Sequence, residues 1–167
     1  EQGLCLAFSG GIDSTLLLYL CREMNILALT FNSDFQTKDE IELTKNLCKK
    51  FGVEQIIIEQ SVFDNPIVLN NPKDRCYYCK KFLFEKALET AKIRGLKYII
   101  DGTNFDDLSV YRPGRKALRE LGVISPFAKF EITKKEIREF AKECGIEIFN
   151  KPSSPCLATR FPYGEKL

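Results

Sequence analysis

Histidine is absent from the 167 residues of the sequence. Its absence excludes a histidine general base and every zinc site that needs an imidazole ligand. No apolar run approaches the ~20 residues needed to cross a membrane, and no signal peptide is visible. We therefore expect a cytoplasmic protein without a membrane partner. The formal net charge is only +2, which gives no electrostatic reason to expect a nucleic-acid partner.

Short apolar segments alternate with helical patterns along the whole chain. The length, the 44% hydrophobic content and the 29% charged content suit a single globular domain. We expect strands at residues 4–8, 26–31, 56–58 and 98–100, and a fifth at 123–125. We expect a helix that carries the apolar run 16–21 after the loop at 9–15, further helices over 38–51, 75–94, 115–121 and 134–144, and an irregular segment at 61–74. The alternation predicts βαβ units, and hence an α/β, Rossmann-like parallel sheet with helices on both faces.

Capping signals support two of these helices. Asp74 precedes the long helix that should end before Gly95, and it is the expected N-cap. Thr133 and Glu136 have the spacing of a capping box in front of the last helix, which Gly145 should end.

The stretch Ser9-Gly10-Gly11-Ile12-Asp13-Ser14-Thr15 joins the first expected strand to the first expected helix. Its two glycines let the backbone turn sharply and approach a ligand closely. The hydroxyls of Ser9, Ser14 and Thr15 lie where the first free N–H groups of the helix point outward, which is typical of a phosphate site. No Gly-Lys-Ser/Thr follows, so this is not a Walker A motif. Asp13 either helps to hold Mg²⁺ or fixes the loop by accepting backbone hydrogen bonds.

Seven cysteines, an odd number, include a Cys-x-x-Cys pair in the segment Arg75-Cys76-Tyr77-Tyr78-Cys79-Lys80-Lys81. The spacing places Cys76 and Cys79 on one helix face, and the helix N-terminus with the flanking basic residues favours thiolates. Cys156, in a loop near Arg160, is the best candidate for a third ligand. Three thiolates suit an iron–sulfur cluster with one open iron better than closed structural zinc. A redox pair and a site without metal are the alternatives.

The other cysteines fall on apolar faces of the expected strands and helices. As small residues of apolar character they are expected in the core, and they are Cys5, Cys21, Cys48 and Cys144.

A second polar cluster, Asp101-Gly102-Thr103-Asn104-Phe105-Asp106-Asp107, follows the strand expected at 98–100. Asp106 and its neighbour could coordinate Mg²⁺ or position a sugar, or could belong to an ordinary Asx-rich turn. Arg112 and Arg115, a few residues later, are suited to hold a phosphate or carboxylate of a second substrate. The carboxyl ends of parallel strands meet at one edge, so residues 9–15, 32–34, 101–107 and those from 125 on should converge on one crevice.

The stretch at residues 9–15 resembles the pyrophosphatase loop (PP-loop) of enzymes that split ATP into AMP and pyrophosphate. The resemblance implies that the domain has their Rossmann-like fold, of the HUP/PP-loop type. The whole set of motifs resembles one branch of them, the LarE-type sulfur transferases of nickel-pincer nucleotide cofactor assembly. The matching segments are 9–15, 75–81, 101–104, Tyr111-Arg112-Pro113-Gly114, Lys151-Pro152 and 155–164. The resemblance implies that ATP adenylates a carboxylate of a pyridinium mononucleotide and that sulfur then displaces AMP, leaving a thiocarboxylate.

Residue chemistry and resemblance together assign roles to the site residues. Nucleotide binding is expected of Ser9, Gly10, Gly11, Asp13, Ser14, Thr15, Gly102 and Thr103. Substrate binding is expected of Arg112, Arg115 and Asp106, and catalysis of Cys156 and Asp13.

Members of the resembled family differ in their sulfur source. Some sacrifice the cysteine that matches Cys156 and end with dehydroalanine. Others bind a [4Fe–4S] cluster through three cysteines, and Cys76, Cys79 and Cys156 match this second kind. We therefore expect ATP, Mg²⁺ and a [4Fe–4S] cluster as cofactors, a small-molecule nucleotide substrate, a separate sulfur donor and a homo-oligomer.

Three other functions are weighed against this one. An iron–sulfur tRNA thiolase is disfavoured by the near-neutral charge and by the lack of zinc-ribbon cysteines. An amidating ligase like NAD or GMP synthetase gives no reason for the three cysteines, and a nucleotide-binding module without turnover would release no AMP. We expect a PP-loop domain at 1–147 and a loop-rich segment at 148–167 that carries the third cysteine. The chain starts without Met and stops at Leu167 as if another element began there, so we expect a further C-terminal part.

Overall fold

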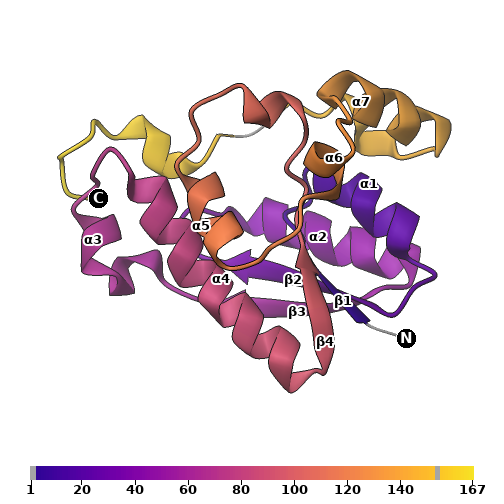
Figure 1. The fold of residues 1–167 in the computed structure, drawn as a ribbon, viewed down its shortest axis with the longest axis horizontal. Coiled ribbons are helices and arrows are strands. Elements are labelled where there is room, and N and C mark those ends of the chain that lie inside the picture. Colours follow the sequence, from indigo (N-terminus) through magenta and orange to yellow (C-terminus); the bar gives the residue numbers. More distant parts are fainter. Residues whose placement is uncertain (1–2, 153–154) are drawn as a thin grey trace.

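A parallel β-sheet forms the centre of the computed structural model, which describes residues 3–152 and 155–167. Within these residues the sheet has four strands, in the order β3-β2-β1-β4. They are β1 (Gly3–Ala7), β2 (Ile26–Asn32), β3 (Glu54–Glu59) and β4 (Leu96–Ile100). The chain moves outward from β1 to β3 and then returns to pair β4 with the free side of β1 (Figure 1). This reversal beside β1 is the switch point at which such sheets bind ligands.

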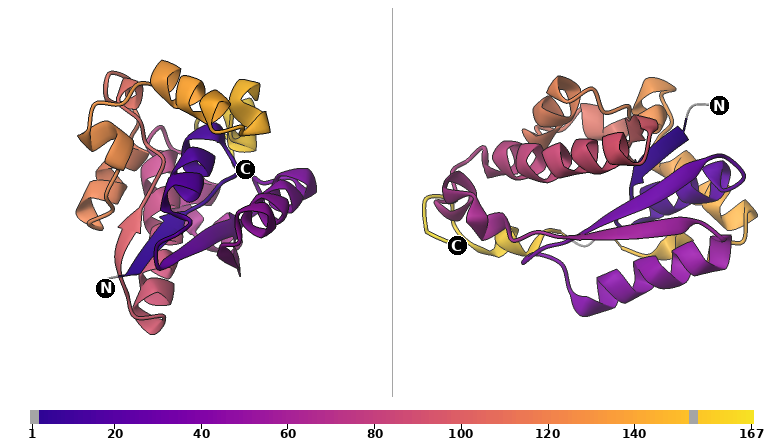
Figure 2. Two further views of the ribbon diagram at one scale, coloured as in Figure 1. Left: turned by 90° about the vertical axis from the view of Figure 1, so that its right-hand side faces the viewer. Right: turned by 90° about the horizontal axis from the view of Figure 1, so that it is seen from below.

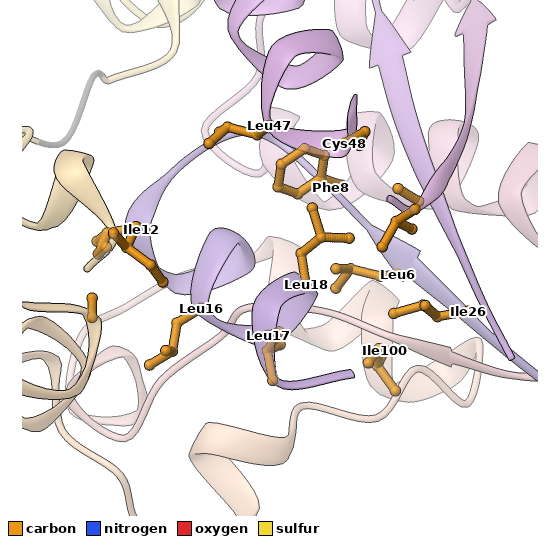
Figure 3. Packing of buried hydrophobic residues seen from close by; sticks show 14 of the residues in the cluster. Leu6, Phe8, Ile12, Leu16, Leu17, Leu18, Ile26, Leu47, Cys48 and Ile100 are labelled. Atoms are coloured by element: carbon orange, nitrogen blue, oxygen red, sulfur yellow. The ribbon is translucent and has the colours of Figure 1, made fainter. Parts of the chain in front are cut away.

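Helices cover both faces of the sheet, as the sequence predicted (Figure 2). One face packs against α1 (Ile12–Cys21), α2 (Lys38–Phe51) and α7 (Lys134–Glu143). The other packs against α4 (Arg75–Ile93) and α5 (Gly114–Glu120). Neighbouring strand residues alternate between the two cores: Leu6 belongs to the first cluster and Cys5 to the second, and both are fully buried. Figure 3 shows the first cluster, in which Leu18 of α1 lies beside Leu6 of β1, and Phe8 lies between Leu18 and Cys48 of α2.

Local signals set the ends of the helices next to the site. Thr37 caps α2: its side chain accepts a hydrogen bond from the Glu40 N–H at 3.2 Å, and the Glu40 carboxylate accepts one from the Thr37 N–H at 2.9 Å. Thr133 and Glu136 form the same capping box on α7, which confirms the prediction. The left-handed Gly52 ends α2 with φ of 68°, a conformation that favours glycine.

Two local predictions from the sequence are wrong, and a third is confirmed only in part. Residues 123–125 form no strand, only one parallel bridge between Ile100 and Ile124, because α6 (Pro126–Lys129) starts directly afterwards. The segment expected to be irregular contains the 3₁₀ turn η1 (Val62–Asp64) and the short helix α3 (Pro66–Leu69). Asn65 caps α3 and Pro66 takes its first position, a start signal the sequence carried. Asp74 takes the N-cap position of α4 as predicted, but its side chain makes no capping hydrogen bond.

The remaining described segments are short turns: η2 (Asp106–Leu108), η3 (Glu147–Asn150) and η4 (Leu157–Arg160). The turn η4 lies within the segment at 148–167 that was predicted to be loop-rich, and η3 overlaps the start of that segment. Among the residues that the structure describes, no helix combines the length and the apolar character needed to cross a membrane.

Candidate functional site

Residues 9–15, called the PP-loop here after the loop that they resemble, lie at the carboxyl end of β1 and lead into α1. Gly10 has φ of +71°, and a Cβ on it would lie 3.0 Å from the Thr44 methyl group, so glycine is needed there for conformation and for space. Gly11 is the N-cap of α1 in an extended conformation, and no side chain caps the helix at this point. The first N–H groups of α1 are therefore free of side-chain caps and available to an anion, and binding of a phosphate there stays a prediction.

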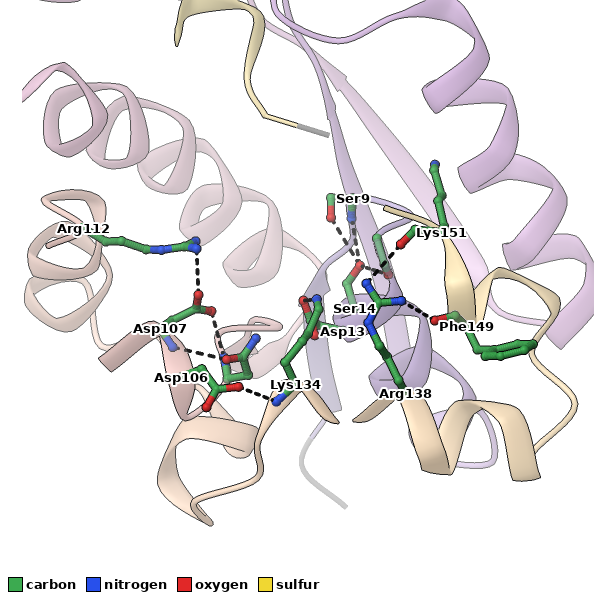
Figure 4. Close-up of polar contacts among 12 residues, drawn as sticks. Ser9, Asp13, Ser14, Asp106, Asp107, Arg112, Lys134, Arg138, Phe149 and Lys151 are labelled. Carbon is green, nitrogen blue, oxygen red and sulfur yellow. Dashed lines mark hydrogen bonds and ion pairs between the residues drawn. The ribbon is translucent and has the colours of Figure 1, made fainter. Parts of the chain in front are cut away.

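The hydroxyls of Ser9 and Ser14 contact each other at the N-terminus of α1 (Figure 4). Ser14 Oγ donates to the Gly11 carbonyl at 3.2 Å and lies 3.3 Å from Ser9 Oγ. Thr15 is fully buried, and its hydroxyl oxygen has no hydrogen-bond partner within the described residues. The structure thus brings Ser9 and Ser14 together as predicted, whereas the Thr15 hydroxyl makes no such contact with either of them; the role of all three in nucleotide binding stays a prediction.

The segment after β4 packs directly on the first turn of α1. A Cβ on Gly102 would lie 2.9 Å from the Ser14 nitrogen, closer than any side chain tolerates. Asp101, which is buried, accepts hydrogen bonds from Thr103 Oγ1 at 2.6 Å and from Ser125 Oγ at 2.5 Å. The predicted convergence of residues 9–15, 101–107 and 125 is therefore confirmed.

Residues 32–34, which were also expected in this crevice, make hydrogen bonds to residues 59–62 instead. The Asn32 amide donates to the Glu59 carboxylate at 2.8 Å. Asp34 accepts from Ser61 Oγ and from the Val62 N–H, both at 2.9 Å. These contacts tie the end of β2 to the segment after β3, and no hydrogen bond or ion pair in the described residues joins them to the PP-loop.

Lys134 contacts Asp13 and was missed at the sequence level. Its Nζ lies 2.6 Å from Asp13 Oδ2, while Asp13 Oδ1 is buried without a hydrogen-bond partner in the described residues. The backbone N–H of Lys134 donates to Asp106 Oδ2 at 2.8 Å, so one residue links the PP-loop to the second polar cluster (Figure 4). A signal was available: a lysine in the first turn of a helix opposes the helix dipole, which favours acidic residues there.

The predicted substrate-binding residues have structural partners. Asp106 accepts the Lys134 N–H, and Arg112 pairs with Asp107 at 2.9 Å. Arg115 donates to the carbonyl oxygens of Asp107 at 2.9 Å and Leu108 at 3.1 Å, which fixes the η2 turn. Both arginines also line a hollow of about 480 Å³ between α4 and α5. Their predicted contact with a substrate stays a prediction.

The three candidate ligand cysteines lie near one another, at the start of α4 and beside η4. Negative charge on Cys76 and on Cys156 would each act on Cys79, which places the three thiols in one region. Cys76 and Cys156 are exposed and Cys79 is half-buried. Burial raises the pKa of Cys79 to about 11 and also raises the pKa of Cys156.

The expectation that flanking cations keep the thiols at the start of α4 ionised is therefore wrong for Cys79. Lys80 does lower the pKa of Cys79, but desolvation is the larger effect. The Lys80 ammonium lies over the Phe84 ring, 4.9 Å from its centroid, rather than against a sulfur atom.

In the part of the chain that the structure describes, no three side chains of the types Cys, Asp and Glu form a group that could hold a metal ion. Thiolate sulfur is the usual ligand of iron–sulfur clusters, so the residue types fit a cluster, and the cluster itself stays a prediction. As predicted, Cys5 and Cys48 are core residues; burial raises their pKa values to about 11 and about 12.

Cys156 lies at the same edge of the sheet as the PP-loop. The charge of Glu40, at the start of α2, acts on Cys156, and α2 also supplies Thr44 against Gly10. Upstream, Arg138 on α7 donates to the carbonyl oxygen of Lys151 at 3.2 Å (Figure 4). The segment that carries the third cysteine is thus attached to the helix that carries Lys134.

Comparisons with known proteins agree with this geometry. The family model described as "Queuosine biosynthesis protein QueC" matches residues 4–68, which include the PP-loop. An uncharacterized protein of Synechocystis is 37% identical, over 97% of this chain and 62% of its own length. The pyridinium-3,5-bisthiocarboxylic acid mononucleotide synthase of Lactiplantibacillus plantarum is 32% identical, over 99% of this chain and 62% of its own length.

Among solved structures, NMN synthetase from Francisella tularensis has a TM-score of 0.72, covering 92% of this chain and 66% of that one. Its 17% identity makes this a likeness of fold alone. The chain spans about 62% of the length of the curated relatives described above. It has the α/β fold of the NMN synthetase structure and is similar over almost all of its length to the pyridinium-3,5-bisthiocarboxylic acid mononucleotide synthase, in agreement with the resemblance drawn from the sequence.

Proposed function

We propose that the protein uses ATP to adenylate a carboxylate of a pyridinium mononucleotide and then replaces AMP with sulfur. The main support is the convergence at one sheet edge of an uncapped PP-loop, the Gly102 segment and the Cys156 loop. The similar synthase of Lactiplantibacillus plantarum, whose name gives a bisthiocarboxylic acid mononucleotide as product, supports the same substrate class.

The PP-loop side of the site would bind ATP and stabilise the departing pyrophosphate. As the bond to the β-phosphate breaks, negative charge grows on the pyrophosphate oxygens. The free N–H groups of α1, the hydroxyls of Ser9 and Ser14, and the Lys134 ammonium are donors fixed in place before the reaction. Such preorganised donors lower the barrier without further reorganisation.

Asp13 fits a role in holding Mg²⁺. Its Oδ1 is buried without a hydrogen-bond partner in the described residues, and Mg²⁺ prefers carboxylate and phosphate oxygens. Asp13 would hold the ion through this oxygen, and Mg²⁺ when bound supplies positive charge against the phosphates. This assignment chooses between the two roles that the sequence left open for Asp13.

The cysteine side of the site would supply the sulfur. A carboxylate is a poor electrophile, and adenylation turns one of its oxygens into a good leaving group as AMP. Sulfur then forms a bond to the carboxyl carbon while the C–O bond to AMP breaks. The attacking sulfur is either the Cys156 thiolate or a sulfide. Attack by Cys156 would give a thioester, from which the thiocarboxylate leaves when the Cα proton is removed and the Cβ–Sγ bond breaks, so that residue 156 becomes dehydroalanine. For attack by sulfide, Cys76, Cys79 and Cys156 would hold a [4Fe–4S] cluster, which when bound offers an open iron for sulfide.

The test is a turnover assay with a pyridinium dicarboxylate mononucleotide, ATP, Mg²⁺ and a sulfide source under anaerobic conditions. We expect equal amounts of AMP and pyrophosphate, and a product in which one carboxylate oxygen is replaced by sulfur. Absence of AMP with every pyridinium carboxylate would overturn the proposal in favour of a binding module. AMP formation that requires tRNA would overturn it in favour of a tRNA thiolase.

The sulfur source needs a separate measurement. After anaerobic reconstitution we expect the wild-type protein and the control Cys144→Ala to retain iron and sulfide, and Cys76→Ala to retain little of either. Equal iron in Cys76→Ala, or none in wild type, contradicts the cluster. In that case mass spectrometry after turnover should detect loss of H₂S at Cys156.

A further inference from the structure

A buried pair of side chains, Asn71 and Arg75, lies immediately before the Cys-x-x-Cys pair. Asn71 is fully buried and Arg75 is 2% exposed. The Arg75 guanidinium donates to Asn71 Oδ1 and lies over the Tyr163 ring, 5.4 Å from its centroid. Within residues 3–152 and 155–167, Arg75 forms no ion pair with a carboxylate. A buried cation without a negative partner is costly, so its presence calls for an explanation.

The same pair holds the end of the chain. The Asn71 amide donates to the Pro162 carbonyl at 2.8 Å, and the Asn71 carbonyl accepts from the Gly164 N–H at 2.9 Å. The Leu167 N–H then donates to the Leu69 carbonyl at 3.0 Å. Figure 1 shows the C-terminal segment, in yellow, running beside α3 and the start of α4.

Asn71 has a backbone conformation that suits this task. Its φ is 52°, in the left-handed region that Asn adopts more readily than most residues. This turn directs its carbonyl and its side-chain amide at the same C-terminal segment. Phe161 and Tyr163, which flank the bonded Pro162, are 49% and 57% exposed, so apolar burial contributes little to holding them. These polar contacts therefore hold the middle of the segment, between the buried Ala158 and Leu167, which packs against the second core cluster.

Cys156 is attached to the same segment. The turn η4 joins it to Phe161, and Ala158 within η4 is fully buried. The positive charge of Arg75 acts on Cys156 and on Cys79, which places the guanidinium near thiols from both segments. The contacts that fix the C-terminal segment therefore also fix the distance between Cys156 and the pair at the start of α4.

We propose that Asn71 and Arg75 form a buried clamp that holds Cys156 beside Cys76 and Cys79, with Arg75 as the cation facing the negative sulfur ligands assembled there. The proposal deepens the proposed function, because it concerns the cysteine site of that function. It explains the buried cation: its anionic partner is the set of thiolates that forms when the site is loaded. Arg75 and Asn71 are positioning residues, and neither is assigned a contact with the substrate.

The test measures the clamp without turnover. The iron-free protein is treated with a short bis-maleimide, and the yield of the cross-linked peptide joining Cys76 to Cys156 is measured by mass spectrometry. We expect Arg75→Gln and Asn71→Gly to reduce this yield at least about fivefold, since each removes a polar contact that holds the segment. Glycine keeps the left-handed backbone at position 71, so that variant isolates the side-chain amide. Lys92→Gln, at the exposed far end of α4, removes a charge from the same helix and should leave the yield unchanged.

A second readout is the iron retained after anaerobic reconstitution, which we expect to fall in Arg75→Gln and Asn71→Gly and not in Lys92→Gln. Circular dichroism selects the folded variants, and if Arg75→Gln does not fold, Asn71→Gly decides. A cross-linking yield in a folded clamp variant within about twofold of wild type overturns the clamp, because loss of a holding contact should cost more. Absence of AMP formation by wild type overturns the proposed function instead, so the two failures are distinguishable.

Discussion

Lys134 is the side chain whose role follows most directly from one contact. Its ammonium pairs with Asp13 at 2.6 Å, beside the N–H groups of the PP-loop. We expect Lys134→Met to lower kcat/KM for pyrophosphate release by about 10- to 100-fold, since a charge-assisted hydrogen bond contributes about 1.5–3 kcal/mol. Lys134→Arg should recover part of the loss because it keeps the charge. The measurement is a continuous pyrophosphate assay at varied ATP concentration.

The neighbouring Lys135 provides a matched control. Its side chain is 85% exposed, and its Nζ lies 3.9 Å from Glu139 Oε1, at the outer limit of an ion pair. Lys135→Met should therefore retain wild-type kinetics and stability. If Lys134→Met and Lys135→Met behave alike, the ammonium at position 134 has no part in nucleotide binding, and the Asp13 pair is merely structural. Thermal melting of both variants separates a kinetic effect from partial unfolding.

The sequence predicted some site residues better than others, and the distance along the chain explains why. Ser9, Gly10 and Ser14 lie within one continuous loop, so their residue types and spacing were enough to predict that they form one site. Lys134 reaches Asp13 across 121 positions, and no local pattern states which helix start will face the loop. Arg75 was interpreted as a local cation beside thiols, while the structure gives it partners far along the chain.

The start of α7 should affect both stability and catalysis, whereas the similarly capped α2 should affect stability alone. Both begin with a Thr-x-x-Glu capping box, but only α7 presents Lys134 to the PP-loop. We expect Thr133→Ala and Thr37→Ala each to lower the free energy of unfolding by about 1 kcal/mol. Only Thr133→Ala should also raise KM for ATP. Urea unfolding and the pyrophosphate assay check this, and an equal rise in KM for Thr37→Ala would contradict it.

The effect of Thr133 also has a defined pH dependence. Hydrogen bonds from Thr133 lower the pKa of Glu136 below its usual 4.5. A lowered carboxyl pKa contributes stability to the folded state above about pH 4.5. This contribution is lost as the pH falls through the pKa that the carboxyl group has in the folded state. The difference in stability between wild type and Thr133→Ala should therefore shrink on acidification below about pH 4.5.

The helices and strands were predictable where apolar runs and caps coincide, and less so where a proline interrupts a run. The four strands of the sheet, α2 and α7 follow from alternation and capping. Residues 123–125 have the composition of a strand, but only Ile124 pairs with the sheet before Pro126 starts α6. Pro66 marks the start of α3 in the same way. In both places proline begins a short helix, where its fixed φ suits the first position and its missing N–H costs no hydrogen bond.

The whole molecule buries a thiol in each of the two cores that flank its sheet. Cys5 belongs to the core under α4 and Cys48 to the core under α2. Burial raises their pKa values from 9.0 to about 11 and about 12, because an ionised sulfur would lose its hydration there. The two faces of the sheet are therefore both sensitive to alkaline pH for the same reason.

Above the unfolded pKa of 9.0 the unfolded chain releases these protons while the folded protein keeps them. Folding stability is thus intact below about pH 9 and falls as the pH rises toward the folded values, by at most about 1.4 kcal/mol per pH unit for each thiol. We expect the free energy of unfolding in urea to fall between about pH 8 and about pH 10.5, and Cys48→Ala to reduce that fall by about 2 kcal/mol. Lysines and tyrosines titrate in both proteins, so the comparison between them isolates the thiol. An identical fall in wild type and Cys48→Ala would show that the buried thiols do not govern alkaline unfolding.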